Sequence, residues 1–238
     1  MQPSALSHAF AWVGAALFAS SLLYFLYAYL VVFGEPAGSG DWVRPAFVNT
    51  LLFSVFALHH SVLARPPLRQ RVRRLVPPYL ERSLYAWAAS LLFLAVCWTW
   101  RPVPGMVYRL EGVWWWLGAA SQAAGLLIAH LGSTALDALD LAGVRQIREA
   151  RSGAAPARVP LQTTGIYRLV RHPIYLGWIL LVFGAPTMTA TRLVFAIVSS
   201  AYLAIAVPFE ERGLVDAFGV DYLAYQRDVR WRMVPGVY

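Results

Sequence analysis

Charged residues are scarce in this chain. They make up 13% of its 238 residues, whereas hydrophobic residues make up 59% and the mean hydropathy is +0.54. Soluble globular domains carry about 25% charged residues, which cover their surfaces. The shortage of polar surface excludes a soluble globule and indicates an integral membrane protein.

Cysteine and lysine are also nearly absent. The single cysteine, Cys97, has no second cysteine to pair with, which excludes a disulfide framework and a thiolate metal cluster, and we predict no metal site. All 20 basic residues are arginines. The sequence has no soluble basic domain that would carry them to DNA or RNA, so we expect no nucleic-acid partner.

Six apolar runs approach the length needed to cross the hydrocarbon core, about 20 residues per helix. They cover residues 9–33, 46–64, 84–100, 113–136, 174–189 and 193–209. They predict an all-α fold, a polytopic membrane helix bundle of about six transmembrane helices with a cytoplasmic cap. We expect a single membrane domain over 1–238, with the first four transmembrane helices in 1–136. Residues 137–238 would hold the last two and the functional core.

The arginines are unevenly distributed between the loops. Loops 65–83 and 137–173 each contain six arginines, whereas loop 34–45 contains one arginine and two acidic residues. Short cytoplasmic loops hold the excess of positive charge in membrane proteins. We therefore expect a multi-pass protein of the cell (inner) membrane with both termini cytoplasmic. Contact between arginines and anionic membrane lipids accounts for the net charge of +8.

The densest polar cluster, residues 163–178, lies at the start of the fifth apolar run. Pro173 suits the first turn of a helix, so we predict that this helix begins at about His172. Free N–H groups and the positive end of the helix dipole favour an anionic group there, and Arg171 adds a bidentate fork for carboxylate or phosphate. His172 and Tyr175 are three residues apart and share a face.

A second polar group, Glu210-Glu211, closes the sixth apolar run. Tyr202, Ala206 and Glu210 fall on one helical stripe, so Glu210 is expected to face the same cavity as the first cluster or a neighbouring helix. Its carboxylate is suited to hold an ammonium group.

The tail from Gly213 to Tyr238 is predicted to contain an amphipathic helix. Its apolar side chains recur at spacings of four, four and three residues, the period of a helix with one buried face. These side chains are Leu214, Phe218, Tyr222 and Tyr225. We expect this helix to lie against the cap and to close a pocket.

The polar residues also have a simpler interpretation. Arg168 and Arg171 are typical of inward anchors, and Tyr167 and Tyr175 of an interfacial aromatic belt. The glutamate pair would then be the solvated end of a helix. Together, however, a polar start and a polar finish on consecutive helices favour a functional site, because ionisable groups at membrane depth usually serve function.

The two motifs resemble those of the integral-membrane methyltransferases typified by isoprenylcysteine carboxyl methyltransferase and phospholipid N-methyltransferases. The resemblance covers roughly residues 142–235, with matching order and spacing. It is carried by Gly165-Ile166-Tyr167, the run from Arg171 to Gly177, Glu210-Glu211, Phe218-Gly219, Tyr222, Tyr225 and Pro235.

This resemblance implies S-adenosylmethionine as the methyl donor, bound between the cytoplasmic ends of the last helices and the connecting segments. Residues 137–238 would then be a cofactor-binding core. The positions that match the family's motifs, together with Arg171 and its guanidinium group, are the expected cofactor-binding residues. They are Gln146, Val159, Pro160, Leu161, Gln162, Tyr167, Arg171, His172, Pro173, Ile174, Tyr175 and Glu210.

Further motifs are similar to the bacterial methanethiol S-methyltransferase branch. They are His60-Ser61, Val76-Pro77, Glu81-Arg82-Ser83, Trp100-Arg101-Pro102, Gly143-Val144-Arg145-Gln146 and Pro186-Thr187-Met188-Thr189. In addition, carboxyl methyltransferases of the family tend to have a substrate-binding arginine where this chain has Ala206. The resemblance thus favours a small apolar thiol such as methanethiol, giving dimethyl sulfide. A lipid substrate, either a phospholipid amine or an isoprenylcysteine-like carboxylate, is the alternative.

A thiol acceptor has to lose its proton, because the thiolate is the nucleophile. The candidate catalytic bases are His60, His130 and Glu211. The two histidines lie at comparable depth in the second and fourth apolar runs, so we expect them to border the substrate pocket. The alternative is that they join helices by hydrogen bonds.

Two functions other than catalysis stay open from the residues alone. Paired intramembrane histidines are typical ligands of a haem in an electron carrier. A transporter would show midplane breaks in paired repeats, for which only Pro186 and Pro208 qualify. The haem carrier accounts for neither polar motif, and the two prolines qualify only weakly as the breaks of a transporter. Both functions therefore rank below the enzyme.

Overall fold

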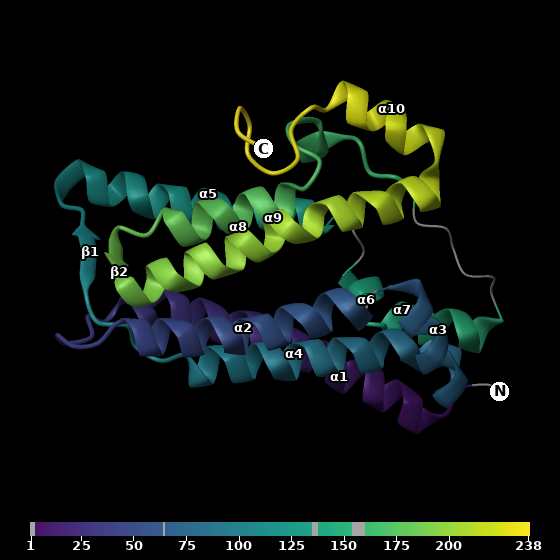
Figure 1. The fold of residues 1–238 in the computed structure, drawn as a ribbon. Coiled ribbons are helices and arrows are strands. Elements are labelled where there is room, and N and C mark those ends of the chain that lie inside the picture. The colour runs from purple at the N-terminus through teal and green to yellow at the C-terminus, as the bar shows by residue number, and fades with distance from the viewer. Residues whose placement is uncertain (1–2, 64, 135–137, 154–159) are drawn as a thin grey trace. The chain divides into compact units, whose positions relative to one another are not determined.

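The structure is a computed structural model that describes residues 3–63, 65–134, 138–153 and 160–238 (Figure 1). The chain forms two compact units, each built from separate stretches. Unit 1 comprises Met1–Val32, Phe47–Arg101 and Leu136–Arg158, and unit 2 comprises Phe33–Ala46, Pro102–Ala135 and Val159–Tyr238.

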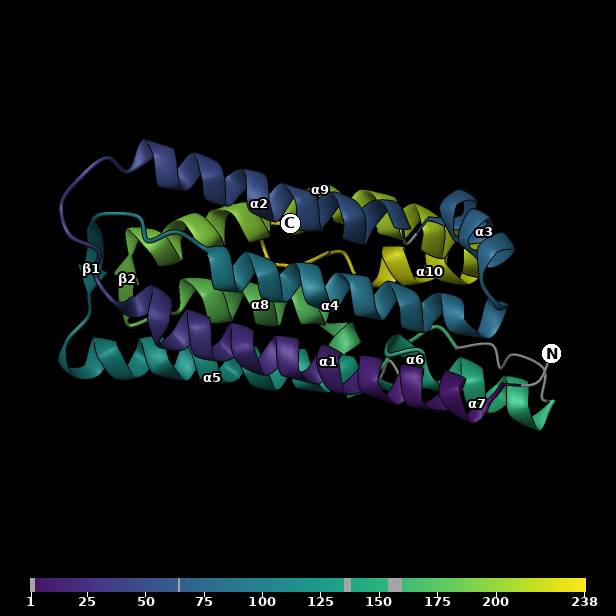
Figure 2. The same ribbon diagram turned by 90° about the horizontal axis from the view of Figure 1, so that it is seen from below.

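Unit 1 is helical. It contains α1 (Ala5–Leu30), most of α2 (Val43–Leu63), α3 (Pro66–Leu75), η2 (Pro78–Leu80), α4 (Glu81–Thr99), α6 (Ala138–Leu141) and α7 (Val144–Ser152). Helix α1 packs along α4 and also contacts α7 (Figure 2). The indole Nε1 of Trp87 donates to the Phe10 carbonyl at 3.0 Å, and Gly14 leaves room for that indole ring. Close packing of these helices thus depends on a small residue opposite a large one.

Unit 2 holds the two polar motifs. Its elements are η1 (Val32–Gly34), β1 (Met106–Arg109), α5 (Gly112–Thr134), η3 (Gly165–Arg168), α8 (Pro173–Phe183), β2 (Thr187–Thr189), α9 (Ala190–Phe218) and α10 (Val220–Asp228). Helices α5 and α8 lie side by side, and α9 runs along α8 (Figures 1 and 2).

Glycines set the close approach of α5 to α8. Gly118, Gly125 and Gly132 follow one another at seven-residue intervals on α5. A Cβ on Gly125 would lie 2.5 Å from the Gly177 carbonyl oxygen, and one on Gly132 would lie 2.9 Å from Ile174 Cγ1. Small residues let helix backbones approach closely in membrane proteins. This contact fixes the start of α8 against the end of α5.

Four helical segments are long and apolar enough to cross a membrane: Ala5–Gly34, Val43–Val62, Pro78–Thr99 and Ala190–Phe218. They agree with four of the six predicted spans and confirm a helical membrane protein. Within the described residues, α5 and α8 do not meet both criteria, and α8 is only 11 residues long. The six-span arrangement and the cytoplasmic cap stay predictions.

The fifth predicted span, 174–189, is wrong at its end, because α8 stops at Phe183. Pro186, which cannot continue a helix, follows Gly184 closely, and β2 then pairs antiparallel with β1, with Thr189 opposite Met106 and Thr187 opposite Arg109. The all-α prediction therefore missed this two-stranded sheet. Its partners lie about 80 residues apart, so no local pattern announces the pairing.

We expected one amphipathic helix in the tail that begins at Gly213, but the tail does not form a single helix. Helix α9 continues through Glu211 to Phe218, and Gly219, with a φ of +58°, separates it from α10. The predicted apolar face is nevertheless shared, because Leu214 and Phe218 from α9 pack with Tyr222 and Tyr225 from α10. A glycine at a positive φ explains the break, since this backbone conformation carries no steric cost for glycine.

Candidate active site

The polar start of α8 is held by the C-terminal segment, residues 229–238. His172 occupies the N-cap position and Pro173 the first turn, which confirms the predicted helix start. The backbone N–H of Arg171 donates to the Trp231 carbonyl at 2.9 Å, and that of His172 donates to the Arg232 carbonyl at 2.8 Å. The helix entrance is therefore anchored by a segment about sixty residues later in the chain.

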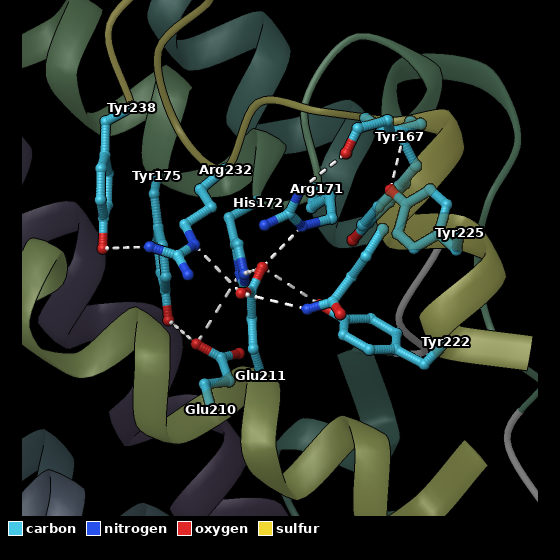
Figure 3. Close-up of polar contacts among 12 residues, drawn as sticks. Tyr167, Arg171, His172, Tyr175, Glu210, Glu211, Tyr222, Tyr225, Arg232 and Tyr238 are labelled. Atoms are coloured by element: carbon cyan, nitrogen blue, oxygen red, sulfur yellow. Dashed lines mark hydrogen bonds and ion pairs between the residues drawn. The ribbon is translucent and has the colours of Figure 1, made fainter. Parts of the chain in front are cut away.

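The Glu211 carboxylate lies at the centre of the site, with its side chain only 5% exposed (Figure 3). It accepts hydrogen bonds from Arg171 Nε at 2.6 Å, Arg232 Nε at 3.1 Å, Gln226 Nε2 at 3.3 Å and the Tyr222 hydroxyl at 3.4 Å. A buried carboxylate is tolerated only when it is paired and hydrogen-bonded. Two guanidinium groups and two neutral donors meet that requirement here.

Arg171 joins Glu211 to the C-terminal segment. Its Nη1 donates to the carbonyls of Val229 at 2.7 Å and Arg230 at 2.9 Å, while its Nε donates to Glu211. Arg232 approaches the same carboxylate from the segment itself. Burial, the largest single influence, lowers the pKa of Arg232, but the charge and hydrogen bonds of Glu211 and Tyr238 together outweigh it, so this pKa is raised. The raised pKa keeps Arg232 charged.

Glu210 differs from its neighbour because its side chain is 44% exposed. Its Oε2 accepts a hydrogen bond from the Tyr175 hydroxyl at 2.8 Å and lies 3.8 Å from His172 Nδ1. The His172 and Tyr175 rings stack with centroids 5.3 Å apart and an angle of 4° between their planes. His172 Nε2 is buried without a hydrogen-bond partner, although Glu211 Oε1 lies 3.4 Å away. The side chains of His172, Tyr175 and Glu210 thus converge beside the buried Glu211 (Figure 3).

Three tyrosines, one on η3 and two on α10, support the site. The Tyr167 hydroxyl donates to the Gly132 carbonyl at 3.0 Å, and the Tyr225 hydroxyl donates to the Tyr167 carbonyl at 2.6 Å. Burial, followed by the nearby Glu210 carboxylate, raises the pKa of Tyr167 to about 12. Burial also raises the pKa of Tyr222 and Tyr225. All three remain neutral hydrogen-bond donors at physiological pH.

Most of the predicted cofactor-binding residues of unit 2 lie at or beside this site. Pro173 and Ile174 pack against Gly132, and Leu161 packs against the tyrosine cluster. Pro160 is exposed and Gln162 is half-buried. Val159 lies outside the described residues.

Three other predicted residues are placed differently. Gln146 belongs to unit 1, where its Nε2 donates to Asp140 Oδ1 at 2.7 Å. His60 also belongs to unit 1, with Nδ1 2.9 Å from the Tyr85 hydroxyl, whereas His130 is exposed on α5 of unit 2. A joint pocket of the two histidines stays a prediction.

Sequence reasoning missed Arg232, Gln226 and Tyr238. The Tyr238 hydroxyl accepts from Arg232 Nη1 at 3.1 Å and donates to the Ala204 carbonyl at 3.2 Å. Ala204 is four residues before Pro208, whose missing N–H leaves this carbonyl without its helical donor. An arginine close behind α10 and a proline inside an apolar helix were the only local signals.

The sequence of this chain is similar to those of known proteins. The phospholipid methyltransferase family matches residues 146–221. Methanethiol S-methyltransferase 2 of Bradyrhizobium diazoefficiens is 37% identical over 92% of this chain and 86% of its own length. Methanethiol S-methyltransferase of Mycobacterium tuberculosis is 35% identical, with coverages of 84% and 89%, and that of Pseudomonas deceptionensis is 34% identical, with 79% and 72%.

No solved structure matches the chain significantly. These three relatives are named methyltransferases, they align over most of both chains, and the segment that matches the family contains the start of α8 and the Glu210-Glu211 pair. This chain therefore belongs to the methanethiol S-methyltransferase family of membrane methyltransferases.

Proposed function

We propose that this enzyme transfers a methyl group from S-adenosylmethionine to methanethiol and forms dimethyl sulfide. The relatives' names support the acceptor. The observation that carries the donor site is the convergence of His172, Tyr175 and Glu210 beside the buried Arg171–Glu211 pair. Such a group of fixed polar side chains at the end of an apolar helix is suited to a small charged cosubstrate.

The residues fit the chemical groups of the donor. The half-exposed Glu210 carboxylate is suited to the ammonium group or the ribose hydroxyls. The face of Tyr175 is suited to the sulfonium, where a cation–π contact contributes about 0.5 to 2 kcal/mol. We propose the remaining predicted residues of 137–238, from Gln146 to Ile174, as further parts of this core.

The bound donor supplies an electrophilic methyl carbon on a positively charged sulfur that leaves as a neutral thioether. The task of the protein is then to hold the thiolate in line at about 3 Å, to exclude water and to take the thiol proton. His172, Tyr175 and Glu210 orient the donor in this proposal. Their positions are fixed by the buried contacts around Glu211.

His60 is the best supported of the three candidate bases. The Tyr85 hydroxyl lies 2.9 Å from His60 Nδ1 and donates to the His60 backbone carbonyl at 3.1 Å. Because the carbonyl only accepts, we infer that Nδ1–H donates to the phenol oxygen, which leaves Nε2 as the basic nitrogen. Both oxygens of Glu211 already accept two hydrogen bonds each. His130, which is exposed, is the second choice.

We also propose that both termini lie on the cytoplasmic side of the cell membrane. This orientation puts the donor site in the compartment where S-adenosylmethionine is made. The arginine-rich segments 65–83 and 137–173 support this orientation. Protease accessibility of tags placed at each terminus in sealed spheroplasts would test it.

The function is tested by supplying methyl-labelled donor to purified protein in lipid nanodiscs. Methanethiol, a phosphatidylethanolamine and a prenylcysteine analogue are offered in parallel, with Glu210→Ala as the matched control of weakened donor binding. We expect labelled dimethyl sulfide in the headspace and unlabelled lipids. Label in a lipid alone would overturn the acceptor and leave the enzyme class intact.

A further inference from the structure

Arg232 is tied to the site by its side chain and by its backbone. Its Nε donates to Glu211 Oε2 at 3.1 Å, and its Nη1 donates to the Tyr238 hydroxyl at 3.1 Å. Its carbonyl accepts the backbone N–H of His172 at 2.8 Å. One residue of the C-terminal segment therefore contacts both the centre of the site and the start of α8 (Figure 3).

Arg171, about sixty residues before Arg232 in the chain, contacts the same carboxylate. Its Nε donates to Glu211 Oε1, and its Nη1 donates to the carbonyls of Val229 and Arg230. The side chain is 6% exposed. These contacts commit the guanidinium to Glu211 and to the C-terminal segment, so the two arginines form a clamp on Glu211.

The clamp is anchored at its far end on α9. The Tyr238 hydroxyl accepts from Arg232 and donates to the Ala204 carbonyl, which Pro208 leaves without a helical donor. A hydrogen-bonded chain thus runs from Arg171 through Glu211, Arg232 and Tyr238 back to the helix that carries Glu210.

We propose that Arg232 is a positioning residue for methyl transfer. Together with Arg171 it clamps Glu211, and it thereby fixes His172, which follows Arg171, and Glu210, which precedes Glu211, in the places where they meet the methyl donor. The inference rests on the proposed donor site at His172 and Glu210. It assigns the C-terminal segment a role in donor binding, which Arg232 exerts without touching the donor.

Removal of the Arg232 charge and loss of positioning would change the affinity for S-adenosylmethionine in opposite directions. The carboxylates of Glu210 and Glu211 balance the charges of Arg171 and Arg232. Removing Arg232 leaves an extra negative charge, which favours the cationic S-adenosylmethionine over the product S-adenosylhomocysteine, which lacks the sulfonium charge. Loss of positioning instead weakens both ligands by the same factor. The ratio of the two affinities therefore separates the two effects.

The test compares wild type, Arg232→Ala, Arg232→Lys and Arg227→Ala in nanodiscs. Arg227 is an exposed arginine of α10, so its removal is a control for the same change of charge. Calorimetry gives the affinity of each variant for S-adenosylmethionine and S-adenosylhomocysteine, and turnover assays give KM for donor and acceptor separately. All measurements are made well below the unfolding midpoint of each variant.

We expect Arg232→Ala to weaken binding of both ligands and to raise the donor KM by roughly tenfold, the equivalent of one charge-assisted hydrogen bond. The acceptor KM should stay unchanged, and Arg227→Ala should behave as wild type. Arg232→Lys keeps the pairing with Glu211 but does not bridge to Tyr238, so it should raise the donor KM only about twofold to threefold.

Unchanged donor affinity in Arg232→Ala, or stronger binding of S-adenosylmethionine alone, would overturn the positioning role. If Arg232→Ala does not fold, Arg232→Lys decides, and a donor KM equal to that of wild type then counts against the clamp. A wild-type protein that binds neither ligand would instead refute the proposed function, so the two failures are distinguishable.

Discussion

Substituting Gly125 by alanine tests whether the close contact between α5 and α8 sets the position of the site. A Cβ at Gly125 would lie 2.5 Å from the Gly177 oxygen and 2.7 Å from the Leu181 nitrogen. Both are backbone atoms of α8, so no side chain can rotate away. Ordinary contact begins at 3.4 Å, so the helices have to separate by about 0.9 Å at this point.

The cost follows from that separation. A gap of 0.5 to 1 Å already forfeits roughly a quarter to a half of the dispersion energy of each contact. Overpacking of this kind costs about 1 to 3 kcal/mol, or more where backbone is involved. Alanine regains about 1 kcal/mol of helix propensity. We expect a net loss of about 2 kcal/mol in the free energy of unfolding and, because α8 begins at His172, a raised donor KM.

Gly213→Ala is the matched control. Gly213 lies inside α9, and a Cβ there would meet nothing within 4 Å. The same substitution should therefore stabilise the protein by about 1 kcal/mol through helix propensity alone. Unfolding in mixed micelles, followed by circular dichroism, measures both variants. If Gly125→Ala were as stable as Gly213→Ala, the close α5–α8 contact would not exist in the protein.

Three other predictions concern the site. His172→Ala and Glu210→Ala should each weaken donor binding about tenfold in calorimetry, and unchanged affinity in both would remove them from the pocket. Tyr238→Phe should cost about 1 to 2 kcal/mol in the free energy of unfolding, and less together with Pro208→Ala, which restores a helical donor for the freed carbonyl, while the hydrogen bond from Arg232 is lost in both backgrounds; equal costs in both backgrounds would exclude this role. The pKa of Tyr167 is raised from 10.0 to about 12, so its contribution to stability is complete below pH 10 and is lost as pH rises towards 12. Tyr167→Phe should reduce the pH dependence of unfolding in that window, and an unaltered slope would contradict the shift.

Helix positions were readable from hydropathy, but helix ends were not. The apolar runs located α1, α2, α4 and α9 because burial in lipid requires long apolar stretches. Hydropathy reports only the apolar surroundings of a segment. The fifth predicted span therefore extended through Gly184 and Pro186, where the backbone leaves the helix and enters β2. Turn residues and pairing between distant segments decide such ends.

The site was predictable where its residues follow a local rule. Pro173 indicated the start of α8, and the spacing of His172 and Tyr175 indicated a shared face, which their stacked rings have. Arg232 and Tyr238 follow no local rule, because they act through contacts with residues dozens of positions away. Such contacts follow from the tertiary fold alone.

The adjacent glutamates illustrate why a helix end can hold structural and functional groups side by side. Successive residues on a helix point about 100° apart, so Glu211 faces the protein, where four donors satisfy it, while Glu210 faces outward with a half-exposed carboxylate. At membrane depth an unsatisfied buried charge is costly, so the polar groups that fix the site pair with one another. In the proposed donor site, the half-exposed side chain of Glu210 is then the group that is offered to a ligand. Two consecutive residues thus hold a buried, paired carboxylate and a half-exposed one.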